Sequence, residues 1–288
     1  MDKVYLVLIV VGLLFIGSVT YSYMAFTDGF PWGDKIAVIE INGPIDFGPM
    51  QNGVAPVQIA SLIKEAEENP SVKAIVLEIN SPGGSPVSSD EIARAVRDAE
   101  KPTVAWLGDI AASGGYWIAA SADKIVAHPM SVTGSIGAFS LLVELSDLMD
   151  DVGVNVEYIQ SAEYKSLGSP FHNATDEEKQ ILLDMVLEIH EQFVQTVAES
   201  RGMDVEAVRK IADGRPFSGR TAYELGLVDS LGNEQDAIEL AKELGGVEGE
   251  PEIIRMQPKK PLFLDLFSTP FTLAKGVSGL EAGNLITT

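Results

Sequence analysis

The chain has 288 residues, of which 46% are hydrophobic, and this is enough for a hydrophobic core in one large or two small domains. Cysteine is absent, which excludes disulfides, thiol nucleophiles and cysteine-bound zinc or iron–sulfur centres. The sequence carries 20 basic against 42 acidic residues, a formal net charge of -22, and a surface of that charge repels nucleic acid. We therefore expect no nucleic-acid partner.

The N-terminal residues 4–27 contain no charged side chain. A helix of about 20 residues spans the hydrocarbon core of a membrane, so this run is long enough to cross it. A cleaved signal peptide would end in small residues, and the far end of the run (YSYMA, residues 21–25) is a poor cleavage site. We expect an uncleaved transmembrane anchor over residues 1–27, followed by a short linker over residues 28–34.

Charges that flank the run indicate its orientation. Lys3 and the amino terminus precede it, whereas Asp28 and Asp34 follow it. Positive charge is enriched on the cytoplasmic side of membrane helices. We therefore expect a single-pass protein of the cell membrane whose body is extracytoplasmic.

Beyond the linker, strand-like and helix-like segments alternate, which is typical of an α/β fold. The strand candidates are nearly continuous apolar runs, as in a sheet covered on both faces. They are residues 35–41, 74–80, 103–107, 124–127 and 156–160. Helices are expected between them over residues 57–68, 88–100 and 114–122.

The C-terminal half is predicted to be mainly helical. Thr175 and Glu178 have the spacing of a capping box, and apolar residues follow them at helical period. Two further helices are expected over residues 204–212 and 234–244. We place the main domain at residues 35–248 and leave residues 249–288 as a tail that docks a partner or membrane, or is disordered.

Two glycine-rich turns are candidates for function. The first (NSPGG, residues 80–84) directly follows an apolar strand, and its glycines allow backbone N–H groups to face an anionic atom. In the second (AASGGYW, residues 111–117), small residues surround Ser113 at the start of a predicted helix. Free N–H groups at a helix start stabilise a developing oxyanion. An N-cap role for Ser113 is the alternative, but a cap does not need glycines and alanines on both sides.

A serine nucleophile needs a base. None of the three histidines, His128, His172 and His190, lies in an obvious triad context. Lysine is the other choice, because burial disfavours the ammonium form and lowers a lysine's pKa.

Three lysines were compared as candidates for this base. Lys64 and Lys124 both follow a serine at S-x-x-K spacing, but the first lies near acidic residues of a helix and the second beside Asp123. Lys165 is flanked instead by small residues and turn formers, with Glu163 nearby. The residues alone only suggest Lys165.

Five segments in order resemble the SppA-type signal peptide peptidase family. They are the two glycine-rich turns together with TGSIG (133–137), YKSLGSP (164–170) and ADGRPFSGR (212–220), and the match runs from about residue 35 to 232. The resemblance implies a Clp-protease/crotonase-like α/β fold of repeated ββα units. It also implies homo-oligomers shaped as a ring or bowl, with the catalytic sites facing the interior.

The resemblance further implies roles for individual residues. Ser113 would be the nucleophile and Lys165 the general base, supplied by the same or by a neighbouring subunit. Ser135 would orient the lysine amine, and the N–H groups of Gly84 and Gly114 would form the oxyanion hole, with Gly83 as a possible substitute for Gly84. No metal, nucleotide or other cofactor is implied. Asp213 and Arg215, also shared with the family, are interpreted as a structural pair.

The function expected from these features is that of a membrane-anchored serine endopeptidase with a Ser–Lys dyad. Its substrates would be apolar peptides such as signal-peptide remnants, cleaved through an acyl-enzyme. One alternative is a processing peptidase for one membrane protein. Two others belong to different classes, a crotonase-like acyl-CoA enzyme and a non-catalytic membrane scaffold.

Overall fold

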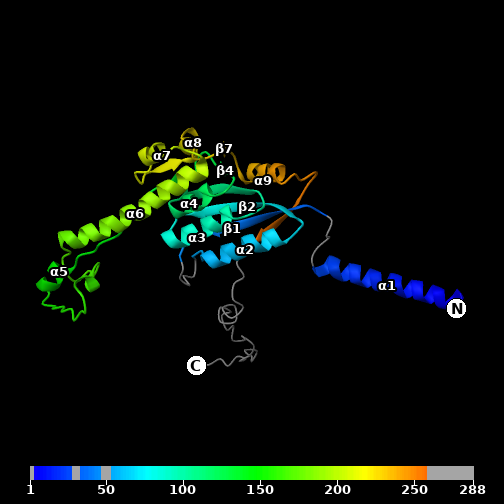
Figure 1. Cartoon of the computed structure of the whole chain (residues 1–288), viewed down its shortest axis with the longest axis horizontal. Coiled ribbons are helices and arrows are strands. Elements are labelled where there is room, and N and C mark those ends of the chain that lie inside the picture. Colours follow the sequence, from blue (N-terminus) through cyan, green and yellow to red (C-terminus); the bar gives the residue numbers. More distant parts are fainter. Residues whose placement is uncertain (1–2, 28–32, 47–52, 258–288) are drawn as a thin grey trace, which may run out of the picture. The chain divides into compact units, whose positions relative to one another are not determined.

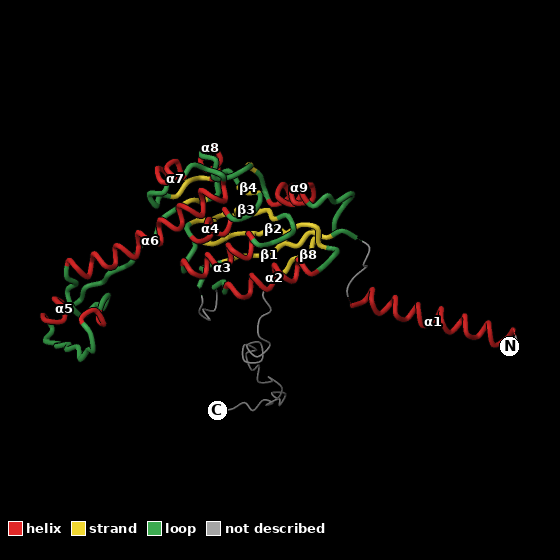
Figure 2. The backbone as a smooth tube through the Cα atoms, viewed as in Figure 1, coloured by secondary structure: helices red, strands yellow, loops and turns green. Residues whose placement is uncertain are grey.

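The computed structural model describes residues 3–27, 33–46 and 53–257. Two compact units are recognised, Met1–Gln257 and Pro258–Thr288, and the second lies outside the described residues. Within the first unit, helices enclose a central sheet (Figures 1 and 2). The predicted α/β class is confirmed.

The central sheet is built from parallel strands. Its main path runs β6-β5-β3-β2-β1-β8, and β4 and β7 branch from β3. All paired strands are parallel except β5 and β6. The strand bounds are β1 (Lys35–Asn42), β2 (Val72–Ser81), β3 (Thr103–Ala112), β4 (Lys124–Ala127), β5 (Val132–Gly134), β6 (Pro216–Ser218), β7 (Ser230–Leu231) and β8 (Glu252–Met256).

Strand β3 has two neighbours along the same edge. Its first half pairs with β4 and its second half pairs with β5. The register sets Ala112 opposite Gly134, and on the other side Ser81 opposite Ala111. Because these strands end together, the segments that follow them meet at one edge of the sheet, the edge at which α/β folds commonly bind ligands.

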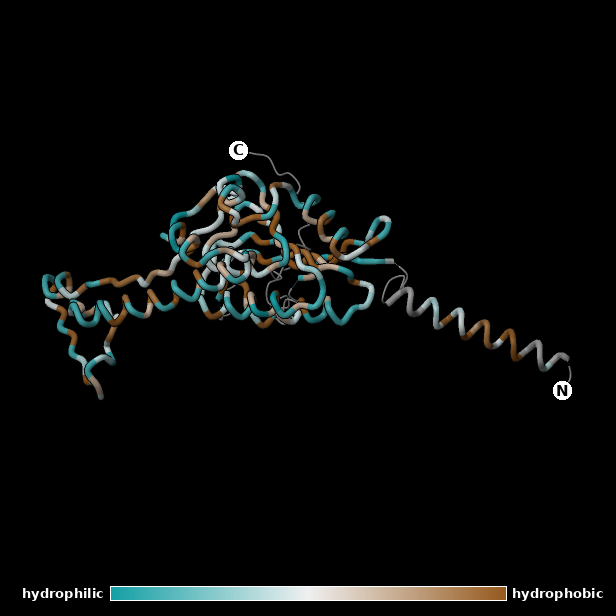
Figure 3. Tube along the Cα trace, turned by 45° about the horizontal axis from the view of Figure 1, so that its top comes forward, coloured by the Kyte–Doolittle hydropathy of each residue, from teal (hydrophilic) through white to brown (hydrophobic). Residues whose placement is uncertain are grey.

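Both faces of the sheet are covered, which explains why the strands read as continuous apolar runs. Helices α2 (Pro56–Glu68), α3 (Pro86–Arg97) and α4 (Gly114–Ala120) contribute to the larger apolar core. Helix α9 (Glu234–Leu244) covers the other face, where it packs on alternate residues of the central strands (Figure 1). The hydropathy colouring in Figure 3 shows this apolar interior between more polar outer helices.

The longest helix of the main body is α6 (Asp176–Arg201). Thr175 caps it with a complete capping box, in which its side chain accepts from the Glu178 backbone and the Glu178 side chain accepts from the Thr175 backbone. The second half of α6 packs on α4 and α7. The remaining helices are α5 (Ser146–Asp151), the 3-10 helix η1 (Glu163–Ser166), α7 (Val205–Ile211) and α8 (Gly219–Glu224).

Most predicted elements are found, with bounds shifted by a few residues, but one predicted strand is wrong. Residues 156–160 have no regular secondary structure and pair with no strand among the described residues. Their side chains are exposed, so their apolar character does not reflect burial in a sheet. Strands β5 to β8 were not predicted, because three of them have two or three residues only and β8 is flanked by polar residues.

Strand β8 lies beyond residue 248, the predicted end of the domain. It pairs in parallel with β1 from Lys35↔Glu252 to Ile39↔Met256, so the start of the predicted tail belongs to the sheet. Residues 258–288 of that tail, and residues 28–32 of the predicted linker, lie outside the described residues.

The N-terminal apolar run forms the helix α1 (Lys3–Thr27). Within the described part of the chain, no helix has the combined length and hydropathy that crossing a membrane requires.

Candidate active site

Ser113 stands at a sharp turn between β3 and α4. Its backbone adopts φ 53 and ψ -123, a conformation that side chains other than glycine's rarely take. Such a strained strand-to-helix turn exposes a nucleophilic serine at the end of a sheet in several hydrolases. The Ser113 N–H donates to the Gly134 carbonyl at 2.8 Å, while its hydroxyl has no partner among the described residues. Ser113 is therefore not a side-chain helix cap.

The glycines after Ser113 allow the turn to pack closely. A Cβ on Gly114 would lie 2.2 Å from the Ser89 hydroxyl oxygen, and one on Gly115 would lie 2.7 Å from the Ser81 carbonyl oxygen. Neither space holds a methyl group. The predicted requirement for small residues at this turn thus has a steric cause.

The backbone N–H groups of Gly84 and Gly114 form a candidate oxyanion hole. Neither donates to an acceptor among the described residues, and a Cβ on Gly114 would lie 3.3 Å from the Gly84 nitrogen. The N–H of Gly83, by contrast, already donates to the Ser81 hydroxyl at 3.1 Å. The geometry therefore favours Gly84 over Gly83 as the donor.

Ser135 lies beside Ser113 because β5 ends next to β3. Its φ is 52, and its hydroxyl donates to the Gly214 carbonyl at 3.1 Å. Because the Ser135 hydroxyl proton is donated to Gly214, the oxygen has lone pairs available to accept a hydrogen bond from an amine. An ion pair between Asp213 and Arg215 spans this turn at 2.5 Å and holds the pKa of Asp213 below its usual range.

A pocket of about 660 Å³ opens at Ser113. Its residues come from the ends of the parallel strands and from α6, and Trp117 and Phe193 stack in its wall with ring centroids 4.5 Å apart. The lining residues are Pro82, Gly83, Gly84, Pro86, Ser89, Ser113, Gly114, Trp117, Ser135, Gly137, Ala138, Phe139, Ile189, Phe193 and Gly214. Four of the five predicted site residues thus share one pocket.

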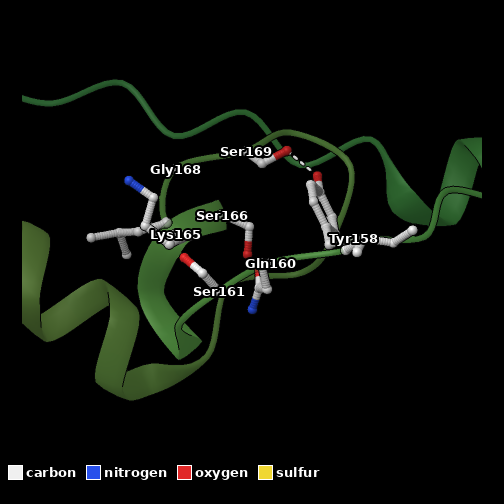
Figure 4. A pocket seen from close by; sticks show the side chains of 9 residues that line it. Tyr158, Gln160, Ser161, Lys165, Ser166, Gly168 and Ser169 are labelled. Atoms are coloured by element: carbon white, nitrogen blue, oxygen red, sulfur yellow. Dashed lines mark hydrogen bonds between the residues drawn. The ribbon is translucent and has the colours of Figure 1, made fainter.

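Lys165 lies elsewhere in the chain. It is exposed in η1, and it lines a separate pocket of about 670 Å³ that shares no residue with the pocket at Ser113 (Figure 4). Its amine makes no hydrogen bond or ion pair with the described residues. Glu163, although close to Lys165 in the sequence, forms no ion pair with it in the described chain.

The length of helix α6 indicates how far Lys165 lies from the pocket at Ser113. Tyr164, next to Lys165, donates a hydrogen bond to Glu177 in the first turn of α6. The pocket at Ser113 is reached only at Ile189 and Phe193 of the same helix. Twelve residues from Glu177 to Ile189 correspond to about 18 Å along a helix. The single chain does not bring Lys165 to Ser113.

The other candidate bases have different partners. Lys64 is exposed and pairs with Glu68 at 3.8 Å, and Lys124 pairs at 3.5 Å with Asp229 rather than with Asp123. Neither lysine lines the pocket at Ser113.

The histidines do not supply a triad either. His172 contacts Glu178 at 3.2 Å, and the His128 ring accepts from the Met130 N–H. His190 lies on α6, and none of the three lines the pocket at Ser113.

The contribution of α6 to this pocket was not predicted. Ile189 and Phe193 belong to the helix's apolar periodicity, which is also typical of core positions. Only their position beside Trp117 distinguishes them as pocket residues. The contacts of residues 158–178, described below, were likewise not predicted.

Comparisons with known proteins agree with these features. A family model described as peptidase family S49 matches residues 95–248. The chain is 35% identical to a putative protease of Methanocaldococcus jannaschii, over 98% of this chain and 96% of that protein. It is 36% identical to a putative signal peptide peptidase SppA of Enterococcus faecium, over 72% of this chain and 63% of the relative.

Among solved structures, a mutant of a membrane-bound stomatin-specific protease matches with a TM-score of 0.53. The match covers 79% of this chain and 99% of that one at 14% sequence identity, so the likeness concerns the fold alone.

Proposed function

The chain belongs to peptidase family S49 and is a serine peptidase of the SppA type, and we propose that it cleaves apolar peptides with a Ser113–Lys165 dyad. In this proposal Gly84 and Gly114 form the oxyanion hole and Ser135 orients the lysine. The strained turn at Ser113, facing two unpaired backbone N–H groups, carries the proposal. That arrangement is what acyl transfer requires of a nucleophile and an oxyanion site.

We place Lys165 of one subunit in the active site of a neighbouring subunit. Two observations support this arrangement: the distance along α6, and the exposure of the lysine, since a lysine base needs an amine shielded from water. The segment that carries Lys165 also exposes apolar side chains, since Ile159 is fully exposed and Phe171, just beyond the segment, is 45% exposed. Contact with a second copy of the chain would bury this surface and assemble a homo-oligomeric ring.

The mechanism follows from these positions. The Ser113 hydroxyl oxygen attacks the scissile carbonyl carbon while its proton passes to the neutral amine of Lys165. The carbonyl oxygen becomes an oxyanion that accepts hydrogen bonds from Gly84 and Gly114, each worth about 3 kcal/mol in the transition state. As the C–N bond breaks, the Lys165 ammonium returns the proton to the leaving amine and an ester remains on Ser113.

The second half of the reaction reverses these roles. Lys165, neutral again, takes a proton from a water molecule that attacks the ester carbonyl. The resulting tetrahedral intermediate collapses, the acyl product leaves as a carboxylic acid, and the Ser113 oxygen regains its proton from Lys165. The Ser135 hydroxyl donates to the Gly214 carbonyl, and in this proposal its oxygen accepts an N–H of the lysine throughout and so aims the amine lone pair at Ser113.

The substrate class is inferred from the pocket and from the relatives. Aromatic and aliphatic side chains such as Trp117, Ile189 and Phe193 line the pocket and suit apolar side chains. Two relatives carry the names signal peptide peptidase SppA and chloroplastic serine protease SPPA. Cleaved signal peptides are apolar and remain in the membrane, so they fit both observations.

We further propose that α1 anchors the protein in the cell membrane with the body outside the cytoplasm. Its support is the uncharged run of residues 4–27 and the exposure of its apolar side chains, including Leu13, Leu14 and Phe15 at 65–69%. Membranes extracted with alkaline carbonate should retain the full chain and release a chain that lacks residues 1–27. Release of both would remove the anchor from the proposal.

Peptide hydrolysis tests the dyad. The full chain and the variants Ser113→Ala and Lys165→Ala are compared on a panel of apolar peptides, with circular dichroism to check folding. We expect cleavage by the unmodified chain and a loss of at least 1,000-fold in both variants, on the order of what removal of a catalytic group costs. Full activity of Lys165→Ala would place the base elsewhere. An inactive unmodified chain would favour a scaffold or an acyl-CoA enzyme.

A further inference from the structure

Lys165 is carried by a loop, residues 158–169, that is closed at its base. The hydroxyl groups of Tyr158 and Ser169, the two ends of this loop, are hydrogen-bonded to each other (Figure 4). Ser169 also accepts the Phe171 N–H at 3.3 Å. In Figure 4, Lys165 lies at the opposite end of the pocket from Tyr158. The Tyr158–Ser169 contact therefore fixes the loop's base and leaves its far end, with the lysine, projecting.

A second contact ties the loop to α6. The Tyr164 hydroxyl donates to the Glu177 carboxylate at 2.7 Å, and this hydrogen bond raises the pKa of Tyr164 to about 12. The phenol therefore remains a donor over the whole range in which a peptidase works. Because Tyr164 precedes Lys165 directly, this contact fixes the backbone from which the lysine extends.

The base of the loop is also braced against the start of α6. The ring of Tyr158 meets the ring of His172 edge to face, with centroids 5.7 Å apart. His172 contacts the buried Glu178, which is part of the capping box with Thr175. The loop is thus closed by the Tyr158–Ser169 hydrogen bond and attached to the N-terminal turn of the 26-residue helix α6 by the Tyr164–Glu177 hydrogen bond.

These contacts matter because the loop has little else to hold it. Most of its side chains are exposed, and Ile159 is fully so. A lysine side chain has large rotamer freedom, and a general base must come within hydrogen-bond distance of its proton. Because the backbone that carries the lysine is already fixed, less conformational entropy is lost when the lysine amine is ordered in the transition state.

We propose that Tyr158, Tyr164 and Ser169 are positioning residues that fix the loop carrying Lys165 and so set the rate of proton transfer from Ser113. This inference rests on the proposed role of Lys165. It does not depend on which subunit supplies the lysine. The three residues touch neither substrate nor the reacting atoms, so they act through Lys165.

Two conservative variants of the full-length chain test the inference. Tyr158→Phe and Tyr164→Phe each remove one hydroxyl and keep the ring. We expect kcat to fall 5- to 30-fold with KM within twofold, because the substrate pocket at Ser113 is untouched. Labelling of Ser113 by a fluorophosphonate should slow by a similar factor. Tyr223→Phe is the matched control, since Tyr223 is 49% exposed and its hydroxyl has no partner among the described residues.

A double variant distinguishes the loss of one shared hydrogen bond from a general destabilisation of the loop. If Tyr158 and Ser169 act as one contact, then Tyr158→Phe combined with Ser169→Ala should be no slower than the worse single variant. Three outcomes would each overturn the inference. The decreases in kcat could multiply in the double variant, kcat could be unchanged in the single variants, or KM could rise while kcat stays constant. Lys165→Ala is measured alongside. Full activity in that variant refutes the proposed base itself, whereas an inactive Lys165→Ala with unaffected tyrosine variants refutes only the positioning role.

Discussion

At the scale of single residues, the site depends on backbone conformation more than on side-chain charge. Ser113 and Ser135 are the only non-glycine residues with positive φ in the described part of the chain, and they lie side by side at the same edge of the sheet. A left-handed backbone at a non-glycine residue costs on the order of 1–3 kcal/mol, and the surrounding structure must compensate for it. Two such residues in one pocket support the proposal that it is the functional centre.

This strain predicts that two substitutions of Ser113 differ in stability. Ser113→Gly should raise the free energy of unfolding by about 1 kcal/mol relative to Ser113→Ala, because glycine adopts φ 53 without the clash of a Cβ. Both variants should be inactive. Chemical denaturation of the two purified proteins measures the difference. Equal stability would show that the turn at Ser113 is not strained in solution.

The residues of the site differ in how far the sequence alone could reveal them. Ser113 and the glycines around it were predictable, because small residues at a helix start indicate a close approach. The choice between Gly83 and Gly84 was not, since it depends on a hydrogen bond from Gly83 to a side chain two residues earlier. The proposed roles of Tyr158 and Tyr164 depend on hydrogen bonds to Ser169 and to Glu177 of α6, and no sequence pattern indicates these contacts.

At the scale of elements, α6 links the two parts of the proposed active site. Its first turn holds the loop that carries Lys165, and its fourth and fifth turns form a wall of the pocket at Ser113. The start of this helix is defined by the capping box of Thr175 and Glu178. A change at the cap should therefore affect the placement of the lysine as well as stability.

The cap makes a prediction with a pH dependence. Thr175→Ala should lower the free energy of unfolding by about 1 kcal/mol at neutral pH. The Thr175 N–H, and then His172, hold the pKa of Glu178 below its usual range. A depressed carboxyl pKa gives stability that is present above the ordinary value near 4 and is lost as the pH falls through the folded value. Thr175→Ala keeps the backbone N–H that the Glu178 carboxylate accepts, so both proteins should lose this stability together and their gap should stay nearly constant from pH 7 to pH 3. Glu178→Gln removes the carboxylate itself, and thermal unfolding should show its gap to the unmodified chain shrinking as the pH falls; a gap of Glu178→Gln that does not change with pH would contradict this role of the carboxylate.

The elements that could be predicted are those with strong periodicity. The central strands and the long helices were identified because a sheet covered on both faces and an amphipathic helix leave clear patterns. Residues 156–160 show the limit, since an apolar run predicts burial but not what buries it. These residues pair with no strand in the described chain, and their exposure fits a surface that meets another subunit.

At the scale of the whole molecule, the described chain holds an incomplete site. The proposed nucleophile, the proposed oxyanion donors and Ser135 lie in one pocket, and the proposed base lies in another. The sequence pattern identified both parts but gave no distance between them. In the proposed assembly, a neighbouring copy would complete the site and would also bury the apolar side chains that the lysine loop exposes.

Mixing two inactive variants tests this account most directly. Ser113→Ala keeps an intact Lys165, and Lys165→Ala keeps an intact Ser113. If the lysine serves a neighbouring subunit, oligomers that contain both variants hold some complete sites. We predict that each variant alone is inactive and that co-assembled mixtures regain a substantial fraction of the unmodified activity. Mixtures that remain inactive, although the two variants are shown to co-assemble, would contradict a dyad shared between subunits.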